Sequence, residues 1–222
     1  MQEFILYLAF SVMETFALFY LAFKAFKIDL YVKEMVFASL IMGTFSFVLR
    51  HDYGLPQADI ILQYLLTVSF LWILFRIHVF YAAIMTGIAY QTYLLIQSFL
   101  YLVMKFTGLY SDVFSNFIVP TYILQFLTAA MIMLLGYLVG VKRKGFDFVP
   151  DKPDGKIAIS KREKVLFILN IPSILLSPLI SYFATNLMHY FIIMPVMYAL
   201  LLFEYLYLSY KKDRVLDEFF GQ

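Results

Sequence analysis

Residues 60–104 read IILQYLLTVSFLWILFRIHVFYAAIMTGIAYQTYLLIQSFLYLVM, and this apolar stretch decides the fold. As one continuous helix it would be about 68 Å long, roughly twice the thickness of the hydrocarbon core of a bilayer. It must therefore fold back once. Arg76 and His78 are its only Lys, Arg, His, Asp or Glu residues, so we expect the turn at residues 75–78, between two membrane spans.

The composition of the whole chain indicates the same class of protein. Of its 222 residues, 63% are hydrophobic and 14% are charged, whereas a soluble domain is about half apolar and about a quarter charged. A membrane span needs about 20 mostly apolar residues. We therefore predict an all-α integral membrane protein, a bundle of about seven transmembrane helices. The expected spans are residues 4–23, 34–50, 59–76, 79–104, 117–141, 164–184 and 188–210.

The distribution of basic residues predicts the orientation of these spans, because Lys and Arg accumulate in cytoplasmic loops. With residue 1 outside, fifteen of the seventeen basic residues lie on the cytoplasmic side, and only Arg50 and Lys105 lie outside. The fifteen are Lys24, Lys27, Lys33, Arg76, the eight within residues 142–164, Lys211, Lys212 and Arg214. The opposite orientation would invert this ratio, so we expect an N-out, C-in arrangement.

The polar segments organise the rest of the chain. We expect residues 1–222 to form a single polytopic membrane domain, with a basic cytoplasmic loop at 142–163 and a short cytoplasmic tail at 211–222. The N-terminal residues lack the positive charge that begins a secretory signal peptide, so we expect the first apolar run to be retained. Basic residues at the inner surface would contact anionic membrane lipids. The net charge of +2 gives no indication of nucleic-acid binding.

Residues with catalytic or metal-binding potential are sparse in this chain. It has no Cys, which excludes a thiolate metal site and a Cys nucleophile, and no metal-ligand spacing such as HExxH is present. We therefore expect no enzyme activity, no metal and no cofactor. The richest polar set lies in the outer loops. Its members would either bind an external ligand or simply face water: Arg50, His51, Asp52, Asp59 and His189.

Ionisable residues inside the membrane are costly and are candidates for function. Glu14 lies near the middle of the first expected span. There we expect it to be protonated and to donate a hydrogen bond to Gln91, or alternatively to Thr92. A structural role and a role in a proton relay both stay open for Glu14. Closer to the inner surface, Arg76 and Glu204 are expected to form an ion pair.

Small and polar residues within the spans predict contacts between helices. Gln63, Gln97, Gln125 and Asn170 are expected to form hydrogen bonds across helices. Gly136 and Gly140 form a GxxxG motif, and Ala83 and Gly87 have the same spacing. Both pairs permit close approach of two helices, within one chain or between two chains. A homodimer through Gly136/Gly140 is therefore one expected contact.

Two aromatic runs, FALFYLAFKAFKIDLY (residues 16–31) and LLFEYLYLSYKKDR (residues 201–214), occur in this N-out, C-in arrangement. The pattern resembles the membrane sensor region of accessory-gene-regulator-type peptide-quorum-sensing receptor histidine kinases. The resemblance covers the whole chain, and it implies spans that bind a processed peptide outside and a cytoplasmic helix that leads to a kinase. The chain has no phospho-acceptor His after its last expected span and no ATP-binding domain. We therefore expect a kinase-less relative or an accessory subunit.

These features together indicate a non-enzymatic sensor or accessory protein of the bacterial cytoplasmic membrane. It would bind a small external peptide or a lipid-like ligand and signal to a partner, such as a histidine kinase or another membrane protein. The alternative is a small transporter, or an immunity protein that protects against a membrane-active peptide.

Overall fold

The computed structural model describes residues 2–109, 118–142, 145–149, 161–186 and 193–220. Over these residues the regular structure is helical, as the sequence predicts. The elements are α1 (Gln2–Ala25), α2 (Val32–Phe47), the π-helical turn η1 (Val48–Asp52), α3 (Pro56–Ile73), α4 (Val79–Phe106), α5 (Ile118–Val141), α6 (Lys161–Ile168), α7 (Asn170–Asn186) and α8 (Ile193–Phe220).

Among the described residues, six helical segments are long and apolar enough to cross a membrane. They correspond to α1, α2 with η1, α3, α4, α5 and the first part of α8. The expected turn at residues 75–78 is confirmed, because α3 ends at Ile73 and α4 begins at Val79. Arg76 adopts a positive φ of 56° in this turn, and the His78 side chain accepts a hydrogen bond from the Phe80 backbone N–H.

The segment expected as the sixth span, residues 164–184, is divided in two at Leu169. The ring of a proline clashes with the carbonyl of the residue four positions earlier and removes a backbone donor. Pro172 stands four residues after Ile168, where α6 ends. The interruption therefore has a local cause in the sequence. The apolar stretch Lys164–Leu179, which includes this interruption, is shorter than the other six.

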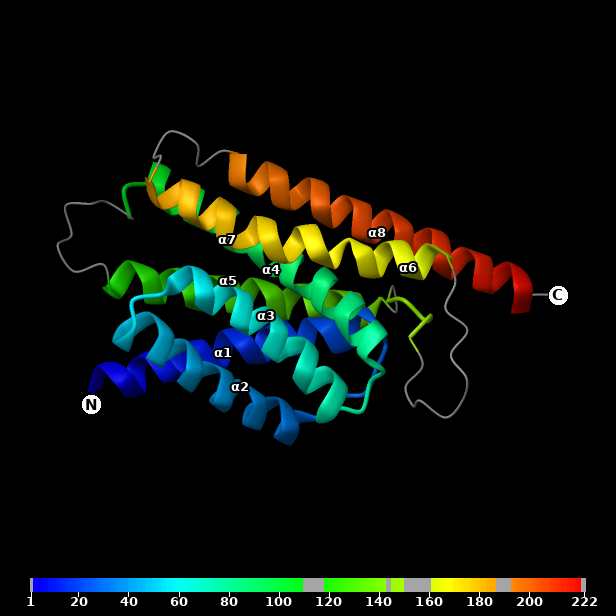
Figure 1. Cartoon of the computed structure of the whole chain (residues 1–222), viewed down its shortest axis with the longest axis horizontal. Helices are drawn as coiled ribbons and strands as arrows, with labels where there is room; N and C mark the ends of the chain where they lie inside the picture. Colours follow the sequence, from blue (N-terminus) through cyan, green and yellow to red (C-terminus); the bar gives the residue numbers. More distant parts are fainter. Residues whose placement is uncertain (1, 110–117, 143–144, 150–160, 187–192, 221–222) are drawn as a thin grey trace.

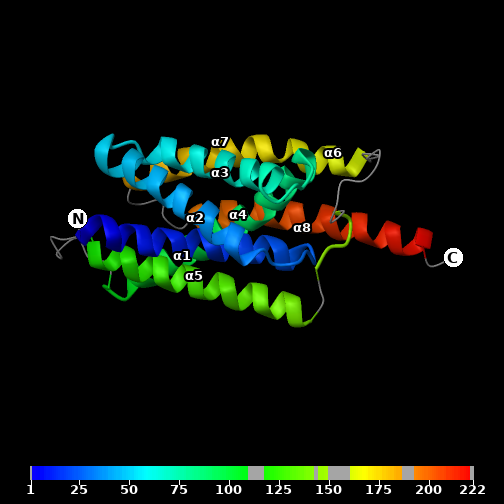
Figure 2. The same cartoon turned by 90° about the horizontal axis from the view of Figure 1, so that it is seen from below.

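The helices run roughly along one common direction and alternate in sense (Figure 1). The N-terminus lies at the same end of the bundle as the turn after η1, the end of α4, the start of α5 and the start of α8. The opposite end holds the α1–α2 and α3–α4 connections, the start of α6 and the C-terminus. Seen from below in Figure 2, α3 and α7 lie along one edge, and α1 and α5 lie along the other.

Helix α4 is the central element, and it contacts α1, α3, α5, α6, α7 and α8. All its residues from Phe80 to Thr92 are buried. Gly87 makes this position possible, because a Cβ atom there would lie 2.6 Å from Asn170 Oδ1 and 2.7 Å from Tyr205 Oη. The close approach predicted from the Ala83/Gly87 spacing is thus confirmed at Gly87.

The GxxxG motif of α5 packs against α1 within the same chain. A Cβ atom on Gly136 would lie 2.9 Å from the Tyr20 ring, and one on Gly140 would lie 3.1 Å from the Lys24 side chain. The homodimer through these two glycines stays a prediction, and its second copy would have to compete with α1 for the same face.

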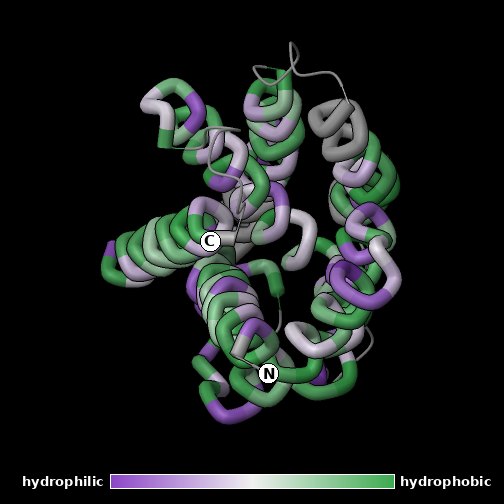
Figure 3. Tube along the Cα trace, turned by 90° about the vertical axis from the view of Figure 1, so that its left-hand side faces the viewer, coloured by the Kyte–Doolittle hydropathy of each residue, from purple (hydrophilic) through white to green (hydrophobic). Residues whose placement is uncertain are grey.

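Hydrophobic positions, drawn in green, recur along the helices between white and purple ones when the bundle is viewed along its length (Figure 3). At the end opposite the N-terminus, residues 145–149 fold back against the α1–α2 connection. The Phe146 N–H donates to Ala25 O at 2.7 Å, and Lys27 forms an ion pair with Asp147. The start of the expected basic loop is therefore packed against the end of α1.

Candidate functional site

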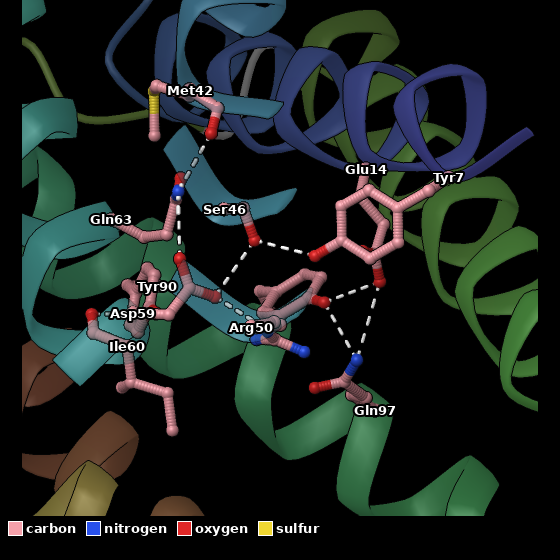
Figure 4. Close-up of polar contacts among 11 residues, drawn as sticks. Tyr7, Glu14, Met42, Ser46, Arg50, Asp59, Ile60, Gln63, Tyr90 and Gln97 are labelled. Atoms are coloured by element: carbon pink, nitrogen blue, oxygen red, sulfur yellow. Dashed lines mark hydrogen bonds and ion pairs between the residues drawn. The ribbon is translucent and has the colours of Figure 1, made fainter. Parts of the chain in front are cut away.

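Asp59 is the centre of a charged cluster at the end of the bundle that holds the N-terminus. It lies in the first turn of α3, which begins with Pro56, and its side chain is fully buried. Its Oδ2 atom accepts hydrogen bonds from Ser46 Oγ (2.9 Å) and from Arg50 Nε, and its Oδ1 atom accepts one from Gln63 Nε2 (3.1 Å) (Figure 4). The positive end of the α3 dipole also stabilises a carboxylate here. Asp59 therefore does not face water.

Arg50 is held by the π-helical turn at the end of α2. The turn spans Val48–Asp52, and the Tyr53 N–H donates to Val48 O at 3.1 Å, five residues earlier. Turns of this kind are rare and occur frequently at functional sites. The Arg50 side chain is 43% exposed, although Nε reaches the fully buried Asp59.

The terminal nitrogens of Arg50 form no hydrogen bond with any residue that the structure describes. A guanidinium group carries five N–H donors in one plane, and only Nε is used by Asp59. The carboxylate thus fixes the side chain and leaves the outer edge of the guanidinium without a partner among the described residues. That edge is suited to a carboxylate or phosphate oxygen pair.

Glu14 lies beside Arg50 and belongs to the same polar region (Figure 4). Its Oε1 atom accepts hydrogen bonds from Tyr93 Oη (2.5 Å) and Gln97 Nε2 (3.3 Å), and Gln97 also donates to Tyr93 Oη (2.8 Å). Tyr7 lies seven residues before Glu14 in α1, and its hydroxyl shares a hydrogen bond of 2.7 Å with Ser46 Oγ. Helices α1 to α4 therefore all contribute to the cluster.

The predicted contact between Glu14 and Gln91 is wrong, and so is the substitute contact with Thr92. Gln91 precedes Tyr93 by two residues, which turns its side chain by about 200° around α4. It is fully buried with both amide atoms unpaired among the described residues. Thr92 donates to Ile88 O of its own helix at 2.7 Å. Glu14 does have polar partners on α4, as expected, but on another face of it.

His51 and Asp52 lie next to the charged cluster without joining it. His51 Nδ1 is 3.1 Å from Asp52 Oδ1, both side chains are more than half exposed, and the His51 ring stacks on Phe47. His189 lies outside the described residues. Within the described part of the chain, no three His, Asp or Glu side chains are grouped so that they could hold a metal ion.

A second polar cluster, of neutral side chains, joins α3, α7 and α8. Tyr64 Oη donates to Asn170 Oδ1, and the Ser173 and Tyr205 hydroxyls are 3.2 Å apart. The Asn170 amide donates to Leu166 O and Phe167 O, both at 3.1 Å. These carbonyls belong to the last turn of α6, which lacks partners where the helix ends. Asn170 thereby connects the end of α6 to Tyr64 of α3.

Cross-helix hydrogen bonds are confirmed for Gln63, which donates to Met42 O at 2.9 Å, and for Gln97 and Asn170. The Arg76–Glu204 ion pair is wrong. Both residues are exposed, and neither makes an ion pair with a described residue. Arg76 lies in a tight turn with positive φ, while Glu204 lies on the outer face of α8.

Comparisons of the chain with protein-family models, with curated proteins and with solved structures give no match. The chemistry of the site therefore rests on its own residues.

Proposed function

We propose that this protein is a seven-pass, N-out, C-in membrane sensor that binds the anionic group of a small external peptide or lipid-like ligand at Arg50. The observation that carries the proposal is the geometry of one side chain. Arg50 is anchored through Nε to a fully buried carboxylate, its side chain is 43% exposed, and its remaining donors have no hydrogen-bond partner among the described residues.

Two features support the topology. The α6–α7 segment runs alongside α8 (Figure 1), and in this proposal it is the seventh pass, although its apolar stretch Lys164–Leu179 is shorter than the other six. The strong bias of basic residues to the other end favours N-out, C-in. In this orientation Arg50 is one of only two external basic residues.

The chemistry of Arg50 favours anion recognition over a purely structural role. A guanidinium can form two parallel hydrogen bonds to a carboxylate or a phosphate. Since Asp59 already fixes the side chain, an incoming anion needs to order little else, and preorganisation of this kind increases affinity. The Asp59 carboxylate also prevents the bound Arg50 from being an isolated buried charge.

A continuous set of contacts leads from Arg50 towards α8. Asp59 is followed in α3 by Ile60, whose carbonyl accepts from Tyr90 Oη at 3.3 Å (Figure 4). The Tyr90 ring packs edge-on against Tyr64 with centroids 5.3 Å apart. Tyr64 reaches Asn170 at the α6–α7 break, so a shift of α3 on ligand binding would be passed to α7 and α8.

The signalling partner in this proposal is another protein of the bacterial cytoplasmic membrane, such as a histidine kinase, and the chain itself catalyses no reaction. A transporter is the second candidate. Glu14 of α1 and Asp59 of α3 both lie close to Arg50. Acidic side chains inside a bundle also occur in proton-coupled transporters.

Binding is tested in nanodiscs with three amphiphiles of equal chain length: dodecyl phosphate, N-dodecanoyl glycine and the neutral N-dodecanoyl glycinamide. At ten times the Kd, binding stabilises a protein by about 1.4 kcal/mol, which raises Tm by about 3–6 °C for a chain of this size. We expect this shift with the two anions in the wild type and no shift in Arg50→Gln. Equal shifts in both proteins, or an equal shift with the glycinamide, would refute recognition of an anion by Arg50.

The topology is tested separately in this chain without cysteine. A Cys introduced at Gln57 should react with membrane-impermeant thiol reagents in intact cells, while a Cys at Asp154 should react only after the cells are opened. The reverse pattern would overturn the orientation, and with it the external position of Arg50.

A further inference from the structure

Helix α8 has one buried face and one exposed face. The buried face repeats at helical spacing and consists of Tyr198, Leu202, Tyr205 and Ser209. The opposite face carries large apolar side chains that are more than half exposed, namely Val196, Leu200, Phe203 and Tyr207. Apolar side chains of this kind are suited to contact with lipid.

Glu204 is the exception on the exposed face. It lies seven residues before Lys211, where the apolar part of α8 ends. At 1.5 Å per residue this places it about 10 Å inside that end. A long Lys or Arg side chain can extend its charge to the membrane surface, but the shorter Glu side chain reaches less far. Glu204 makes no hydrogen bond or ion pair with any described residue.

Acidic residues within membrane spans almost always face the bundle interior or pair with another group. We propose that Glu204 marks an interface for a partner protein, which supplies a transmembrane helix with one Lys or Arg at the depth of Glu204. The inference deepens the proposed function, because it assigns the surface on which the signalling partner of that proposal would bind. Charge complementarity identifies the occupant.

The aromatic residues beside Glu204 favour the same partner. Phe203 and Tyr207 have nearly parallel rings with centroids 6.2 Å apart. Aromatic faces attract Lys and Arg, most strongly where water is excluded. Tyr207 already shows this property, since Lys211 Nζ lies 5.7 Å from its ring centroid. A carboxylate next to exposed rings therefore suits a basic side chain from a neighbouring helix.

A second copy of the chain fits this face less well. A two-fold dimer in a membrane brings the same residues together at the same depth. Two Glu204 carboxylates would then approach each other, and like charges disfavour that arrangement. The proposal is therefore restricted to a different protein.

The test uses a synthetic transmembrane helix of Leu and Ala that carries one Lys at the depth of Glu204, and a matched helix with Leu in place of Lys. Association with the labelled protein is measured in liposomes by resonance energy transfer. We expect the Lys helix to bind the wild type at least about tenfold more tightly than the Leu helix. Glu204→Gln should remove this difference. The control is Glu34→Gln, which neutralises an acid in the first turn of α2, at the same end of the bundle as Glu204. It should retain the preference for the Lys helix.

Several outcomes would overturn the interface. One is equal binding of the two helices to the wild type, and another is an undiminished preference for Lys in Glu204→Gln. Energy transfer between two copies of the protein that depends on Glu204 would show a homodimer instead. The result is independent of ligand binding, because Arg50→Gln should bind the Lys helix normally. If the wild type binds the Lys helix but none of the anionic amphiphiles, the proposed function is refuted and this interface is not. If it binds the anionic amphiphiles but shows no preference for the Lys helix, this interface is refuted and the proposed function is not.

Discussion

The molecule contains two polar clusters that share α3 and differ in charge. The first joins α1 to α4 and holds three ionisable side chains, Glu14, Arg50 and Asp59. The second joins α3, α7 and α8 through hydroxyl and amide groups. Tyr90, which bonds the backbone next to Asp59, packs against Tyr64 of the second cluster and connects the two.

The difference shows which cluster is suited to binding. The polar groups of the neutral cluster find hydrogen-bond partners within the bundle. They are buried and bonded to one another or to helix carbonyls, and they belong to Tyr64, Asn170, Ser173 and Tyr205. Removal of its groups should lower stability and leave ligand binding unchanged. The charged cluster ends in an exposed guanidinium edge, so its groups should affect both stability and ligand binding.

Asp59→Ala should give the largest effect. It leaves Arg50, Ser46 and Gln63 without their common acceptor. Breaking a buried ion pair costs about 3–5 kcal/mol, and the partial exposure of Arg50 reduces our expectation to about 2–3 kcal/mol. Binding of dodecyl phosphate should also be lost, because the guanidinium is no longer fixed. Thermal unfolding with and without the amphiphile measures both, and unchanged binding would separate Asp59 from the site.

Gly87→Ala should destabilise the protein by about 2 kcal/mol, since the new methyl group overlaps Asn170 and Tyr205 in a packed core. The control is Gly43→Ala, whose methyl group would meet the end of the Leu8 side chain at 3.0 Å, where a small movement relieves the contact. We expect the control to cost less than half as much. If Gly87→Ala abolished amphiphile binding once folded, the neutral cluster would belong to the binding site after all.

Removing one hydroxyl from each cluster compares them directly. Tyr205→Phe deletes its bonds with the neutral groups Ser173 and Tyr64. A bond between neutral groups contributes about 1 kcal/mol, whereas a bond to a charged group contributes about 1.5–3 kcal/mol. Tyr93→Phe deletes the 2.8 Å bond from Gln97 and the 2.5 Å bond to Glu14. Equal losses in denaturant unfolding would indicate that Glu14 is protonated, as we expect from its depth. A loss at Tyr93 that is larger by about 1–2 kcal/mol would indicate an ionised Glu14 and contradict that expectation.

Glu14→Gln should have the smallest effect, below about 1 kcal/mol, because the Gln carbonyl can still accept from Tyr93 and Gln97. Normal folding with normal binding of dodecyl phosphate would support a structural role. Normal folding with loss of a pH-driven flux in liposomes would instead support the transporter, because Gln cannot titrate.

The sequence predicted the helices well because hydropathy and length determine where a span lies. It also placed the turn after α3 correctly, since Arg76 and His78 interrupt an otherwise apolar run. Pro172 within the expected sixth span predicts a kink there, because proline removes a backbone donor, and α6 ends at Ile168, four residues before it.

The sequence was less informative about which side chains meet. The partner of Glu14 was sought by depth alone, and depth does not define the rotation of α4 that presents Tyr93 and Gln97. Asp59 was expected to be ligand-binding or water-facing because it follows a loop. Pro56 begins α3 there, so Asp59 turns inward towards Ser46. The neutral cluster was missed because its members lie far apart in sequence, although Gly87 and Asn170 each signalled close packing.

The central claim is that the outer edge of the Arg50 guanidinium binds an anion while Asp59 retains the inner edge. Solid-state NMR on protein with ¹⁵N-labelled arginine, reconstituted with dodecyl phosphate, measures the distance from each guanidinium nitrogen to phosphorus. We expect one arginine whose terminal nitrogens lie about 4 Å from phosphorus, and we expect this signal to vanish in Arg50→Lys. If the same signal persists in Arg50→Lys, or if no arginine approaches the phosphate, the account is contradicted.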